Sequence, residues 1–103
     1  MSLKQFMENN LDVIKNEIIR NIPTDNNKFD TRMFIRSFEK RFAIEYAEFL
    51  NKYEQNSFKH VNGQIGKFLS ANQNLLKIKD VGITQSPNVF GIYSPNQMWV
   101  KTV

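Results

Sequence analysis

Basic and amide side chains that could contact an anion gather in the C-terminal half of the chain. A segment of helical periodicity that starts at Ser57 carries Lys59, His60, Asn62, Gln64 and Lys67. Three lysines follow it, namely Lys77, Lys79 and Lys101. Ammonium groups bind phosphate oxygens, and Asn or Gln amides can form paired hydrogen bonds with the edge of an adenine. These residue types together indicate contact with a nucleic acid.

The net charge of the chain is distributed in the same asymmetric way. Residues 1–54 hold nine basic and nine acidic side chains, whereas residues 55–103 hold five lysines and a single acid, Asp80. The second half therefore carries the whole formal charge of +4. A surface of one sign attracts polyanions. An ordinary solvated surface also uses lysines, and the second half contains no Arg, the residue that most often reads guanine. Both interpretations stay open.

The composition narrows the class of protein. The chain contains no Cys, which excludes disulfides and thiolate sites and favours a reducing compartment. Charged residues interrupt the N-terminal apolar positions, so we expect no secretory signal, and no apolar run approaches the length of about 18 residues that a membrane span needs. We expect a soluble, cytoplasmic protein that contacts no membrane.

Catalytic motifs are missing from the sequence. His60 is the single His, and the nearest preceding acid is Glu54. General acid–base or nucleophilic chemistry needs a partner group beside such a side chain, and the sequence does not suggest one. It also has no phosphate-binding loop, dinucleotide fingerprint or nucleophile elbow. We expect neither an enzyme nor a cofactor or metal site.

Residues 3–22 have the pattern of one amphipathic helix. Its apolar positions are three or four residues apart: Leu3, Met7, Leu11, Ile14, Ile18 and Ile22. Ser2 with Gln5 suggests a capping box, and Pro23 ends the helix. Further apolar side chains widen this face at Phe6, Val13 and Ile19. A face this wide predicts either core packing or docking of a partner.

Residues 30–54 continue with a helical pattern that begins at Asp30 or Thr31. Phe34, Phe38 and Phe42 are four residues apart on one face. One uninterrupted helix would be more than about 35 Å long, so we predict a break near residues 41–44. A basic stripe of Arg32, Arg36 and Lys40 runs along the first part. It is consistent with phosphate contacts or with a plainly solvated face.

The helix predicted for residues 57–70 has two distinct faces. Its apolar face comprises Phe58, Val61, Ile65, Phe68 and Leu69. The opposite face contains Lys59, His60, Gly63, Gly66, Lys67 and Ser70. Each glycine costs a helix about 1 kcal/mol relative to Ala. That cost is offset either by close approach to a phosphate backbone or base edge, or by close packing of another element.

The last part of the chain is rich in strand-forming residues. Two copies of Ser-Pro-Asn, at residues 86–88 and 94–96, are interpreted as turns. This predicts a hairpin with strands at 81–86 and 97–102, joined by a long bent connection. We expect Trp99 to lie in the core and Tyr93 to be exposed.

The fold class that follows is α+β, mostly α with a C-terminal β-hairpin, in a single domain over residues 1–103. The order of helices, a polar helix and a terminal hairpin resembles the winged helix-turn-helix superfamily, with a winged-helix-like core at 30–103 and an extra N-terminal helix at 3–22. The resemblance implies that the third core helix enters the DNA major groove while the hairpin contacts backbone or minor groove. Residues 53–59 are longer than the tight turn of a standard helix-turn-helix.

Two functions follow from these observations. The first is a DNA-binding module of regulatory, phage or mobile-element origin, which contacts double-stranded DNA through the 57–70 helix and the hairpin. The alternative is a protein-interaction or assembly module without nucleic-acid activity. In that case the segment from Leu3 to Ile22 docks a protein partner or forms a homodimer.

Overall fold

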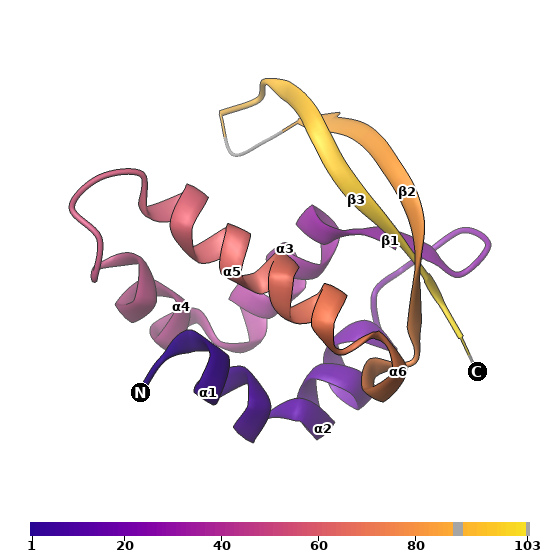
Figure 1. Cartoon of the computed structure of the whole chain (residues 1–103), viewed down its shortest axis with the longest axis horizontal. Helices are drawn as coiled ribbons and strands as arrows, with labels where there is room; N and C mark the ends of the chain where they lie inside the picture. The colour runs from indigo at the N-terminus through magenta and orange to yellow at the C-terminus, as the bar shows by residue number, and fades with distance from the viewer. Residues whose placement is uncertain (88–89, 103) are drawn as a thin grey trace.

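The computed structural model describes residues 1–87 and 90–102, which form an α+β fold. Within these residues six α-helices, one π-helix and a three-stranded antiparallel sheet are present. The helices pack together, and a hairpin of β2 (Ile78–Pro87) and β3 (Tyr93–Lys101) extends beyond them. In the view of Figure 1 it curves above α3 (Thr31–Arg41) and α5 (Ser57–Ala71).

The N-terminal segment is interrupted, so the prediction of one continuous helix is wrong. It consists of α1 (Leu3–Asn9), α2 (Leu11–Val13) and the π-helix η1 (Ile14–Ile19). The break falls at Asn10, whose side-chain amide donates to the carbonyl of Phe6 at 2.8 Å. Such a bond competes with the helical ladder. The predicted capping box at Ser2 and Gln5 is confirmed.

The wide apolar face of this segment is used inside the chain. Its buried members are Leu3, Met7, Ile14, Ile18, Ile19 and Ile22. Phe6 packs edge-on against Phe42, with ring centroids 5.0 Å apart, and Val13 also packs on the core. The side chains that suggested a docking face are therefore covered by the protein's own core.

The aromatic segment forms two helices, as predicted. These are α3 (Thr31–Arg41) and α4 (Ala43–Leu50), separated at Phe42, whose φ of −125° and ψ of 48° are not helical. The Asp30 carboxylate accepts from the backbone N–H of Met33 at 2.8 Å and so caps α3. The four-residue spacing of the phenylalanines buries Phe34, Phe38 and Phe42 together.

The polar helix α5 (Ser57–Ala71) begins at the predicted residue. The short helix α6 (Gln73–Leu76) follows it after a break at Asn72, whose side-chain amide donates to the Phe68 carbonyl at 2.8 Å. The predicted apolar face is buried at Val61, Ile65, Phe68 and Leu69, while Phe58 at its edge is half-exposed.

The sheet has a strand that the sequence did not reveal. The three-residue strand β1 (Lys28–Asp30) pairs with β3 (Tyr93–Lys101), which pairs with β2 (Ile78–Pro87) on its other side. Three residues are too few to display a period. Phe29 at the centre of β1 is fully buried and lies opposite Trp99.

The hairpin is present, but its strands are longer than predicted. They occupy 78–87 and 93–101, so the long bent connection is wrong. The Ser-Pro-Asn segments are strand residues rather than turns, apart from Asn88, which lies outside the described residues. Pro95 is tolerated because β1 pairs only with residues 98–100, which leaves one edge of β3 without a strand neighbour at Pro95.

Two features determine how the hairpin joins the helices. Trp99 is 1% exposed and donates through Nε1 to the Thr31 hydroxyl at 2.9 Å, so its predicted core position is confirmed. A bulge between Asp80 and Gly82 bends β2, and Gly82 has a φ of +111° that favours glycine. Tyr93 is exposed, as expected.

Candidate nucleic-acid interface

The exposed side of α5 presents Lys59, Gly63, Lys67 and Ser70, which we call the α5 face. These residues recur at spacings of three and four, so they lie on one side of the helix. The opposite side is the buried one described above. The helical phase predicted from the sequence is therefore confirmed.

Gly63 has open space around the position of its missing side chain. A Cβ built there meets no atom within 4 Å among the described residues. At Gly66 the nearest atom is Thr31 Cγ2 at 3.8 Å, which is ordinary van der Waals contact. Neither glycine is thus required for close packing inside the chain. Close packing of another element against α5 therefore does not explain why positions 63 and 66 are glycines.

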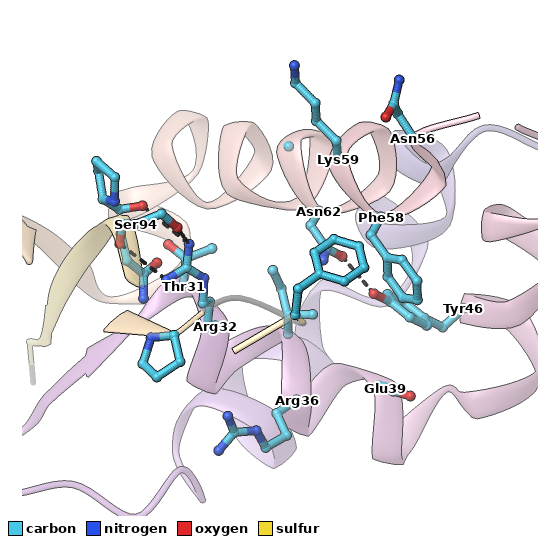
Figure 2. A pocket seen from close by; sticks show the side chains of 16 residues that line it. Thr31, Arg32, Arg36, Glu39, Tyr46, Asn56, Phe58, Lys59, Asn62 and Ser94 are labelled. Atoms are coloured by element: carbon cyan, nitrogen blue, oxygen red, sulfur yellow. Dashed lines mark hydrogen bonds between the residues drawn. The ribbon is translucent and has the colours of Figure 1, made fainter. Parts of the chain in front are cut away.

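A groove of about 780 Å³ lies between α3, α5 and the hairpin. Gly63 and Asn62 line its α5 side, Arg32 and Ile35 line its α3 side, and Ser94 lies on the hairpin side (Figure 2). In Figure 2 Lys59 extends from α5 away from α3. The α5 face therefore adjoins the groove, and Lys59 borders it.

Two of the predicted base-contacting amides are bonded to tyrosines. Asn62 Oδ1 accepts from the Tyr46 hydroxyl at 2.7 Å, and Gln64 Nε2 donates to the Tyr53 hydroxyl at 2.7 Å. Burial raises the pKa of Tyr46 above its ordinary value, which keeps this phenol protonated as a donor. A bidentate contact with adenine uses both ends of an amide. To make such a contact, Asn62 or Gln64 would have to share or break its hydrogen bond with the tyrosine.

His60 is exposed and stacks on Tyr53. The ring centroids are 4.7 Å apart and the rings are inclined by 11°. This stacking ties the start of α5 to the segment that precedes it. Together with the Gln64–Tyr53 bond, it fixes the connection between α4 and α5.

Lys77 and Lys79 are exposed, but they lie beyond the C-terminal end of α5. Lys77 ends α6 with a φ of +57°, and its carbonyl accepts from the N–H of Thr102 at 2.7 Å. Lys79 lies opposite Val100 in the β2–β3 ladder. The length of α5, about 20 Å, separates this pair from Lys59. They therefore do not belong to the α5 face.

Lys101 is hydrogen-bonded to the N-terminal segment. Its ammonium donates to the carbonyls of Ile22 at 2.8 Å and of Arg20 at 3.3 Å. Burial lowers the pKa of this group. Carbonyls at the end of a helical segment attract such a cation. Lys101 therefore acts as a tie within the chain, away from the α5 face.

The contacts of Arg32 are not visible in the sequence pattern. Arg32 shares a basic stripe with Arg36 and Lys40 in that pattern, but its guanidinium turns to the hairpin, whereas Arg36 and Lys40 are exposed. The partners of Arg32 are more than 50 residues away in the sequence, so no local pattern could have identified them.

Comparisons with known proteins give no relative for this arrangement: no family model, curated protein or solved structure matches the chain. Among the described residues, no three His, Asp or Glu side chains are grouped as ligands for a metal ion. None of the helices described has both the length and the apolar character that crossing a membrane requires.

Proposed function

We propose that this chain is a DNA-binding module that contacts double-stranded DNA through the α5 face and the β2–β3 hairpin. The architecture supports a winged-helix-like arrangement, in which α3 and α5 precede the hairpin. Two features would be additions to such an arrangement: β1 adds a strand to the hairpin, and the N-terminal segment packs into the core.

The observation that carries the proposal is the open position of Gly63. A glycine in a helix costs about 1 kcal/mol relative to Ala, and no atom of the described structure lies within 4 Å of the place where a side chain at Gly63 would begin. Lys59 and Lys67 lie one turn away on either side of it. A helix that is bare between two cations lets a phosphate backbone or a base edge approach its main chain.

The hairpin complements this surface with uncharged contacts. Residues 81–100 contain no Asp, Glu, Lys or Arg. We therefore assign the electrostatic part of binding to Lys59 and Lys67 of α5, while the hairpin contributes polar and apolar contacts to backbone or minor groove.

Replacing Gly63 by Ala tests the proposal. We expect Gly63→Ala to raise the free energy of unfolding by about 1 kcal/mol, because Ala favours the helix and the added methyl meets no atom of the chain. We also expect DNA affinity to fall by about tenfold, because the methyl intrudes where DNA approaches most closely. Thermal unfolding and fluorescence anisotropy with a labelled duplex measure the two effects.

Gly66→Ala is the matched control. Its methyl would lie 3.8 Å from Thr31 inside the chain, so it should stabilise the helix without loss of DNA affinity. Wild-type affinity in Gly63→Ala would contradict the assignment of this glycine to DNA contact.

A further inference from the structure

Arg32, in the first turn of α3, holds both strands of the hairpin. Its Nη1 donates to the hydroxyl of Ser86 on β2 at 2.6 Å and also bonds the carbonyl of Ser86. Its Nη2 donates to the hydroxyl of Ser94 on β3. The carbonyls of Ser94 and Pro95 lie 3.4 Å from the guanidinium nitrogens. Figure 2 shows Arg32 directed at Ser94 from α3.

The repeated Ser-Pro-Asn sequence explains how one side chain reaches both strands. Ser86 and Ser94 lie opposite each other in the β2–β3 ladder. Asn96 is buried and donates through Nδ2 to the Ser86 hydroxyl at 2.8 Å, so it holds that oxygen in place. The planar guanidinium presents several N–H donors in a fixed fork that suits two adjacent strands. A lysine ammonium has no such fork.

The place where Arg32 bonds the hairpin indicates what these hydrogen bonds do. Trp99 and β1 anchor the base of the hairpin, but β1 pairs no further along β3 than Met98. From there towards the connection the described hairpin has only its own two strands, and an isolated pair of strands is marginally stable. Arg32 is bonded in this outer part. The two ion pairs among the described residues, Lys4–Glu8 and Arg41–Glu17, do not involve it.

We infer that Arg32 is a positioning residue, which sets the outer half of the hairpin relative to α5 so that both elements meet the same duplex. The inference rests on the proposed DNA-binding function. Arg32 acts through the hairpin: its guanidinium is bonded to hairpin oxygens rather than reserved for DNA.

The test compares Arg32→Lys with Arg36→Lys. Both variants keep the positive charge, and Arg36 is an exposed residue one turn further along the same helix. Arg32→Lys should increase amide hydrogen exchange in residues 83–86, 93, 94 and 96 while leaving α5 and the core helices protected. Because DNA binding would then have to order the hairpin, we expect affinity for a labelled duplex to fall by about tenfold. Arg36→Lys should change neither measurement.

Several results would overturn the inference. Unchanged exchange in Arg32→Lys means that the guanidinium does not hold the hairpin. Faster exchange with wild-type affinity means that hairpin position does not matter for binding. Lost affinity with unchanged hairpin exchange assigns Arg32 to direct DNA contact. If the wild-type protein binds no duplex, the proposed function fails and the DNA role of Arg32 fails with it. Hydrogen exchange still decides whether Arg32 holds the two strands of the hairpin.

Discussion

Reversing the charges of Lys59 and Lys67 together is expected to weaken binding to double-stranded DNA by at least about 100-fold, because like charges placed against phosphates cost several kcal/mol. Both side chains are exposed on the α5 face on either side of Gly63. The double variant Lys59→Glu/Lys67→Glu loses two attractions and gains two repulsions there. Fluorescence anisotropy with a labelled duplex at low salt measures the change.

The matched control is Lys4→Glu/Lys15→Glu. It changes the net charge by the same amount, but its positions lie on α1 and η1, outside the α5 face, in the N-terminal segment that Figure 1 shows below α5. We expect a loss of less than about tenfold, since only the long-range field of the protein changes. Equal losses in the two double variants would mean that net charge alone drives binding, and the α5 face would lose its assignment.

Replacing Trp99 by Ala should lower the free energy of unfolding by about 3–5 kcal/mol, the usual cost of removing a large buried aromatic side chain. Trp99 is 1% exposed, faces Phe29 across the sheet and bonds the Thr31 hydroxyl. The substitution leaves a cavity where β1, β3 and the start of α3 meet. Urea denaturation followed by circular dichroism measures the loss.

Tyr93→Ala is the control for this substitution. Tyr93 is on the same strand but 69% exposed, so its replacement should change the free energy of unfolding by no more than about 0.5 kcal/mol. A loss below about 1 kcal/mol in Trp99→Ala would mean that the hairpin does not depend on this anchor.

The helices around the site were predictable because their signals are local. Apolar spacing alone located α5 and its two faces, and the spacing of Phe34, Phe38 and Phe42 located the helix that supports it. The length of a single helix over residues 30–54 suggested the break that lies at Phe42. Each of these features depends on residues within a few turns of one another.

The features that sequence reasoning missed depend on distant residues. β1 exists because Phe29 pairs with Trp99, about 70 residues later. The Ser-Pro-Asn segments have turn-forming residues, yet strand pairing and Arg32 hold residues 86–87 and 94–96 extended. The break at Asn10 depends on one side-chain hydrogen bond that competes with an otherwise regular apolar pattern.

The candidate site was predictable only in part for the same reason. Lys59 and Lys67 share a face because one helix carries both of them. Lys101 was assigned to the site because of its charge, but in β3 its ammonium lies beside the carbonyls of Arg20 and Ile22 and donates to them. The decisive property of Gly63 is the empty space around it, which only the folded chain reveals.

The most direct test of the central claim is the affinity of the wild-type protein for double-stranded DNA as salt is raised. Lys59 and Lys67 on the α5 face can each neutralise a phosphate and release a counterion. We expect binding at 50 mM salt and a loss of affinity of at least about tenfold at 200 mM salt. Absence of binding at both salt concentrations, or an affinity that does not change between them, would contradict it.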